Sequence, residues 1–65
     1  MGNEPTNSQA DRLALIARNS RRPYDEVVEV WQERAAIREF LAGMSRREAE
    51  RVALDDAADL MFRRA

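Results

Sequence analysis

Only two residues between positions 8 and 65 interrupt an otherwise continuous run of helix-forming sequence, Pro23 and Gly43. Proline lacks a backbone N–H and clashes with the preceding turn, and glycine favours the left-handed conformation in which many helices end. Alanine, arginine, glutamate and leucine, all strong helix formers, dominate the 65 residues, whereas the β-branched residues number seven. The sequence therefore predicts an all-α fold, a single small three-helix domain.

Capping signals predict where the three helices begin. Ser8 is a good N-cap residue, and apolar residues at helical spacing follow it, which predicts a first helix over about residues 9–18. A proline followed by two acidic residues is typical of a first helical turn and predicts a second helix from Pro23 to residue 41 or 42. A Ser-x-x-Glu capping box at Ser45 predicts a third helix over about residues 46–63.

The connection between the second and third helices, residues 43–45, is very short. Two helices joined so tightly usually fold back as an antiparallel hairpin. We therefore expect a first helix about half as long as the others, packed against a long antiparallel hairpin. Residues 1–7 carry little to bury, so we expect a flexible tail there and one domain over residues 8–65.

The absence of histidine and cysteine excludes most enzyme mechanisms. The chain has no side chain that titrates near neutral pH, no thiol nucleophile and no soft-metal ligand. Asp55, Asp56 and Asp59 could suggest a site for a hard metal ion, but i,i+4 pairs from Arg51 to Asp55 and from Asp59 to Arg63 indicate a solvated face instead. We therefore expect a protein that is not an enzyme and that uses neither a cofactor nor a metal.

The predicted helices carry more large apolar residues than a small domain can bury. Seventeen lie in the helices and the hairpin turn, and domains of this size leave much of their surface in water. Around the second helix, Tyr24, Val27 and Trp31 form one apolar arc, and the arc containing Ile37 and Phe40 is centred about 140° away. Either the two other helices each cover one arc, or the second helix bends near its middle, or another chain covers one arc.

These surplus residues have two interpretations. They can complete a compact core, or they can form a face that binds another protein. We favour the second interpretation and expect a homodimer, with the face used for homodimerisation, for a different protein partner, or for both. The face is expected to contain Ile37, Phe40, Met44, Leu54, Met61 and Phe62.

A helix-turn-helix regulator that binds nucleic acid is the alternative function. The first helix, the turn and the second helix have apolar residues near the positions typical of that motif. Residues 23–42, however, carry five acidic and two basic residues, a net charge of −3, which opposes entry into a groove lined by phosphates. Phosphate contacts would have to come from two arginine pairs, Arg21 with Arg22 and Arg46 with Arg47.

All 11 basic residues are arginine, which is typical of GC-rich coding sequences. The stretch Ala-Arg-Asn-Ser-Arg-Arg-Pro-Tyr-Asp-Glu-Val over residues 17–27, with a long charged helix after it, resembles small three-helix proteins carried on plasmids and phages of GC-rich bacteria. The resemblance covers roughly residues 13–42 and implies an accessory protein that regulates or inhibits a larger host or defence protein by binding it. It transfers no catalytic residue. Without an apolar run of membrane-spanning length or a signal segment, we expect a cytoplasmic protein.

Overall fold

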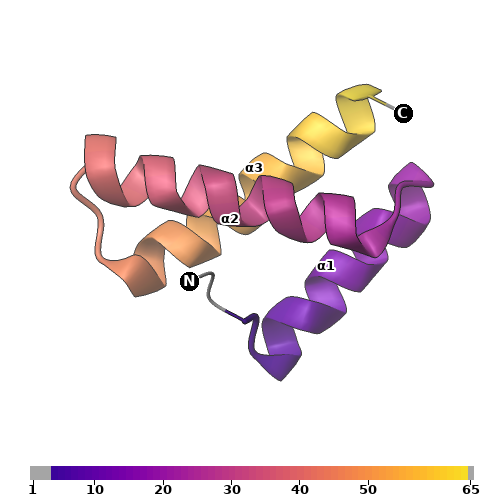
Figure 1. The fold of residues 1–65 in the computed structure, drawn as a ribbon, viewed down its shortest axis with the longest axis horizontal. Helices are drawn as coiled ribbons and strands as arrows, with labels where there is room; N and C mark the ends of the chain where they lie inside the picture. Colours follow the sequence, from indigo (N-terminus) through magenta and orange to yellow (C-terminus); the bar gives the residue numbers. More distant parts are fainter. Residues whose placement is uncertain (1–3, 65) are drawn as a thin grey trace.

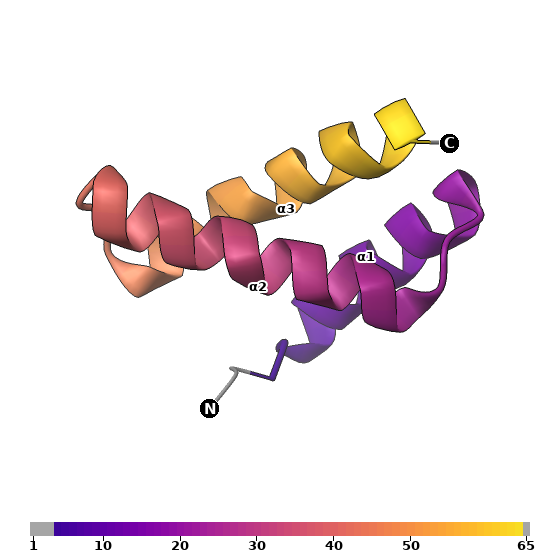
Figure 2. The same cartoon turned by 45° about the horizontal axis from the view of Figure 1, so that its top comes forward.

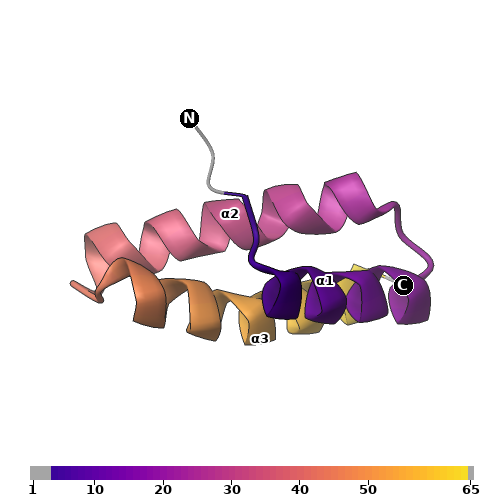
Figure 3. The same cartoon turned by 90° about the horizontal axis from the view of Figure 1, so that it is seen from below.

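The computed structural model describes residues 4–64 and forms three helices in two layers (Figure 1). They are α1 (Asn7–Ser20), α2 (Tyr24–Leu41) and α3 (Arg46–Arg64). Figure 3 shows α1 and α3 side by side in one layer, with α2 lying across them as the other layer. The predicted all-α, three-helix fold is confirmed, and α2 and α3 form the closest helix pair.

Helix α1 begins two residues earlier than the sequence analysis predicted. Thr6, not Ser8, is the N-cap residue: its hydroxyl accepts from the Gln9 backbone N–H at 3.2 Å, and its own N–H donates to the Gln9 side-chain oxygen at 2.8 Å. This reciprocal pair satisfies two backbone N–H groups, whereas Ser8 lies inside the first turn. The predicted tail over residues 1–7 is therefore too long at its C-terminal end, and its residues 1–3 lie outside the described residues.

Helix α1 also ends later than predicted. It contains 14 residues, against 18 in α2 and 19 in α3, so it is not half their length. Ser20 is buried, and its hydroxyl donates to the Ile16 carbonyl at 2.6 Å, which keeps it in the last turn. Arg21 then adopts a left-handed conformation with φ 59°, and the Arg22 N–H donates to the Ala17 carbonyl at 3.0 Å. This is a Schellman ending with arginine in the position that glycine usually takes.

The turn between α2 and α3 agrees closely with the prediction. Gly43 is left-handed with φ +67°, and the Ser45 hydroxyl accepts from the Glu48 N–H at 3.3 Å. Pro23 is the N-cap residue of α2 rather than its first helical residue, a difference of one position. After the turn, α3 runs back along α2 in the opposite direction and at an oblique angle (Figure 2).

The core lies where α2 crosses the layer formed by α1 and α3. Trp31 is its largest side chain, and the indole Nε1 donates to the Glu50 carbonyl at 2.9 Å. Small side chains on α3 let α2 approach closely. The buried cluster contains Leu13, Ile16, Ala17, Val27, Trp31, Ala53, Leu54, Ala57 and Met61.

Candidate partner-binding surface

Two of the six side chains predicted for a protein-binding face belong to the core instead. Leu54 and Met61 are buried by the chain itself. Both belong to the buried cluster. The expectation that they belong to an exposed face is therefore corrected: an amphipathic helix must bury one apolar stripe, and in α3 that stripe includes them.

The last turn of α2 is the most exposed apolar surface of the described residues. Phe40 is 88% exposed and Leu41 is 83% exposed, while Ile37 is half-buried beside them. Phe40 lies nine residues after the buried Trp31, which at about 100° per residue turns it by about 180° to the outer side of the helix. We call Ile37, Phe40 and Leu41 the apolar tip.

The remaining two residues of the predicted set lie at opposite ends of the molecule. Met44 is half-buried in the turn after α2. Phe62 is 48% exposed but belongs to the C-terminal end of α3, which lies at the opposite end of the molecule from the C-terminal end of α2 (Figures 1 and 2). The structure therefore separates the exposed aromatic residues Phe40 and Phe62.

The outer face of α2 continues from the tip as a row of exposed carboxylates. Asp25, Glu29 and Glu33 follow one another at one-turn spacing, and none of the described side chains forms an ion pair or a hydrogen bond with theirs. At about 100° per residue, they and Phe40 lie within about 80° of one another around the helix axis. We call the three carboxylates the acidic stripe.

Most other acidic side chains of the described residues are paired with arginine. The pairs on or between the helices are Glu26 with Arg22, Glu39 with Arg46, Glu48 with Arg51, Asp55 with Arg12, Asp56 with Arg38 and Arg34, and Asp59 with Arg63. Unpaired negative charge is therefore concentrated on the outer face of α2, next to the apolar tip.

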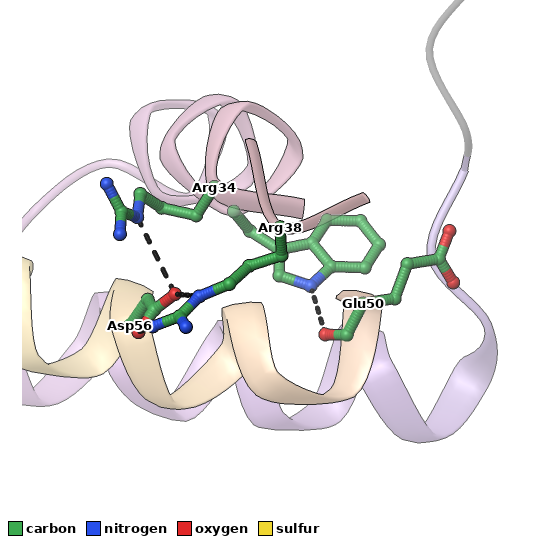
Figure 4. Close-up of polar contacts among 5 residues, drawn as sticks. Arg34, Arg38, Glu50 and Asp56 are labelled. Carbon is green, nitrogen blue, oxygen red and sulfur yellow. Dashed lines mark hydrogen bonds and ion pairs between the residues drawn. The ribbon is translucent and has the colours of Figure 1, made fainter. Parts of the chain in front are cut away.

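One of these ion pairs fixes α2 against α3 below the tip (Figure 4). Arg38 donates from Nε to Asp56 Oδ2 and from Nη2 to Oδ1, each at 2.9 Å. The hydrogen bonds from Arg38 are the main reason why the pKa of the Asp56 carboxyl lies below its usual range. Arg34 Nε lies 3.6 Å from the same Oδ2, is buried, and has no hydrogen-bond partner within residues 4–64. The tip is thus carried by a helix with a rigid attachment.

The four arginines of the alternative function do not come together in the monomer. Arg21 and Arg22 lie in the α1–α2 turn, and Arg46 and Arg47 begin α3, so the pairs lie at opposite ends of α2 (Figure 1). Arg22 Nε is 3.7 Å from the Glu26 carboxylate, and Arg46 Nε is 3.9 Å from that of Glu39. Between the two pairs, the outer face of α2 presents the acidic stripe.

The three aspartates of α3 are occupied by arginine side chains. Asp59 pairs with Arg63 at 3.4 Å, as predicted. Asp55 pairs with Arg12 of α1 at 3.2 Å instead of the predicted partner on its own helix. Within residues 4–64, no three acidic side chains gather into a group that could hold a metal ion.

A groove of about 480 Å³ lies between α1 and the start of α3. Its lining residues are Gln9, Ser45, Arg47, Glu48, Arg51 and Leu54. The Ser45 hydroxyl accepts the Glu48 N–H and therefore caps the start of α3, and Arg51 pairs with Glu48 at 3.8 Å.

In the described part of the chain, no helix has both the length and the apolar character needed to cross a membrane.

The sequence analysis did not include Leu41 in the binding face and used the acids of α2 only as an argument against nucleic acid. The signal for the stripe was present, because residues four apart share one side of a helix. What the sequence could not show is that these carboxylates have no arginine partner among the described side chains. Comparison of the chain with protein-family models, with curated proteins and with solved structures found no match.

Proposed function

We propose that the chain is a non-catalytic module that regulates or inhibits a larger protein by binding it through the outer face of α2. The observation that carries the proposal is the apolar tip, in which Phe40 and Leu41 are almost fully exposed on a helix that Arg38 joins to α3. Isolated exposed apolar residues are ordinary, but adjacent bulky side chains held in place at a helix end are typical of interface anchors.

The tip supplies part of the affinity and not all of it. Fully burying a phenylalanine or leucine side chain contributes about 1.5–3 kcal/mol each, whereas micromolar binding requires about 8 kcal/mol. A partner must therefore also contact neighbouring side chains on the outer face of α2. The acidic stripe is the adjacent surface that offers such contacts.

A different protein fits this face better than a second copy of the chain. In a two-fold homodimer built on the outer face of α2, each copy would bring the same unpaired carboxylates to the interface, and like charges there oppose association. The homodimer expected from the sequence is the alternative to this proposal. Sedimentation equilibrium decides it: we expect a monomer at micromolar concentration, and a dimer that Phe40→Ser dissociates would identify the second copy as the occupant.

The main test compares two chemically identical substitutions. Phe40→Ser removes the exposed aromatic of the tip, and Phe62→Ser removes the exposed aromatic at the far end of α3. We expect a protein from the native cells to be captured by the wild type and by Phe62→Ser but not by Phe40→Ser. Hydrogen exchange of the complex then has to show protection in the second half of α2. Equal capture by Phe40→Ser contradicts the proposal.

A further inference from the structure

The acidic stripe indicates what kind of partner the apolar tip binds. We infer that the occupant of the outer face of α2 is a cationic amphipathic helix of a different protein, with arginine or lysine residues against the acidic stripe and an apolar anchor against the apolar tip. This inference rests on the proposed function, because it specifies the chemistry of the partner for the same surface.

The distribution of paired and unpaired carboxylates over the chain supports a cationic partner. The chain as a whole has a formal net charge of −1, and six acidic side chains within residues 4–63 are paired with arginine. Asp25, Glu29 and Glu33 are exposed, share one side of α2, and have no ion-pair partner among the described side chains. An interface that covers them needs groups of opposite charge on the partner.

The negative charge of the acidic stripe also repels some classes of macromolecule. Nucleic-acid phosphates and the anionic lipids of a membrane surface carry the same sign as the stripe, so approach of either to this face is unfavourable. A second copy of the chain presents the same three carboxylates. Of the macromolecules that could cover the apolar tip, a cationic protein segment is the one whose charge complements the surface beside it.

The spacing of the three carboxylates along α2 also fits a second helix. The three carboxylates are spaced one helical turn apart, with about 5–6 Å between successive Cβ atoms, and they follow the straight axis of α2. Basic residues at i and i+4 on a second helix have the same spacing, so a helix laid along α2 can meet them in register. Phe40 lies seven residues beyond Glu33. The partner helix should therefore carry its apolar anchor about two turns from its nearest cation.

The two parts of the surface have different tasks. The apolar tip excludes water and supplies the anchor, whereas the exposed carboxylates orient the partner and select it by charge. Neutralising the stripe should consequently weaken binding by about tenfold at physiological ionic strength, and less at high salt, because exposed charge pairs are individually weak and screened.

The experiment selects binders without choosing the charge in advance. Helical peptides displayed on yeast are randomised at their solvent-facing positions with lysine, glutamate, glutamine, leucine and phenylalanine, so that the starting library has no average charge. The full chain is the target. Peptides that bind the wild type and Phe62→Ser but not Phe40→Ser are kept as tip-dependent binders. We expect them to carry net positive charge, with lysine pairs at i,i+4.

Two triple variants with the same net charge then separate local from global electrostatics. One neutralises the stripe (Asp25→Asn, Glu29→Gln, Glu33→Gln), and the other neutralises three exposed acids elsewhere (Asp11→Asn, Glu48→Gln, Asp59→Asn). The first should weaken the tip-dependent binders about tenfold, and the second less than about twofold. Binders without a positive bias, or equal weakening by both variants, overturn the inference and leave the proposed function standing. If no tip-dependent binder arises, both are overturned.

Discussion

Asp56 is the residue at which charge, hydrogen bonding and partial burial meet. Its side chain is 17% exposed and accepts two hydrogen bonds from Arg38, while Arg34 adds a second positive charge at 3.6 Å. A bidentate arginine–carboxylate pair has fixed geometry, so it loses less to side-chain entropy than the exposed pairs of α3. The pair therefore contributes to the attachment of α2, and its contribution depends on pH.

Asp56→Asn should lower the free energy of unfolding at pH 7 by on the order of 1 kcal/mol, because the charge-assisted hydrogen bonds from Arg38 are weakened. The pKa of the Asp56 carboxyl is lowered in the folded chain, so its stabilisation is present above the unfolded pKa of about 4 and is lost as the pH falls below it. Between pH 7 and pH 3, the free energy of unfolding measured with urea should therefore fall less for Asp56→Asn than for the wild type.

The exposed carboxylate of Asp59, paired with Arg63 on its own helix, provides the control. Asp59→Asn should change the stability at pH 7 by less than about 0.5 kcal/mol. A variant of Asp56 whose stability falls as steeply with acid as that of the wild type would show that this carboxylate does not carry the pH dependence.

At the scale of the helices, the two turns reach their left-handed residue by different routes. After α2, Gly43 adopts φ +67° without the steric cost that a Cβ atom would bring. After α1, Arg21 adopts φ 59° although it has a Cβ atom, a conformation that costs about 1 kcal/mol or more. The packing of the buried Ser20 and Ile16 just before it holds the turn in place against that cost.

Arg21→Gly should therefore stabilise the chain by about 0.5–1 kcal/mol, since glycine removes the strain at the end of α1. Thermal unfolding followed by circular dichroism measures the change. Arg18→Gly, the same substitution three residues earlier and inside α1, should instead destabilise by about 1 kcal/mol. Destabilisation by both variants to the same extent would mean that the turn stores no strain.

At the scale of the whole molecule, three helices enclose one core and leave the C-terminal turn of α2 outside it. The core forms where α2 crosses the layer of α1 and α3 (Figure 3). Because α1 and α3 both lie on one side of α2 (Figure 3), neither covers the opposite side. Phe40, turned by about 180° from the buried Trp31, is therefore exposed. The six residues predicted for one face are thereby divided between the core, the apolar tip, the turn after α2 and the end of α3.

Two substitutions from that predicted set should differ strongly in their effect on stability. Met61→Ala leaves a cavity in the core and should cost about 2–4 kcal/mol, a large part of the stability of so small a domain. Phe40→Ser should change it by less than about 0.5 kcal/mol, because the side chain is already in water. The buried Trp31 provides the fluorescence signal for urea unfolding. A large loss for Phe40→Ser would contradict the exposed position of the tip.

The sequence by itself determined the number of helices, their approximate limits and the form of the second turn. Those properties depend on residues close together in the chain: Pro23 and Gly43 interrupt the helices, and Ser45 caps the next one. Thr6 and Ser8 are both residue types that cap helices. The additional hydrogen bond from the Thr6 N–H to the Gln9 side-chain oxygen decided in favour of Thr6.

Only the tertiary structure decided which apolar side chains are free and which charges are paired. From the periodicity of α3, Met61 and Phe62 are equally good candidates for the core. The crossing of the helices buries Met61 and leaves Phe62 half-exposed. Pairs such as Arg12 with Asp55 and Arg38 with Asp56 join residues far apart in the chain. The apolar tip and the acidic stripe are what remains after packing and pairing, so they are set by the path of the whole chain rather than by local sequence.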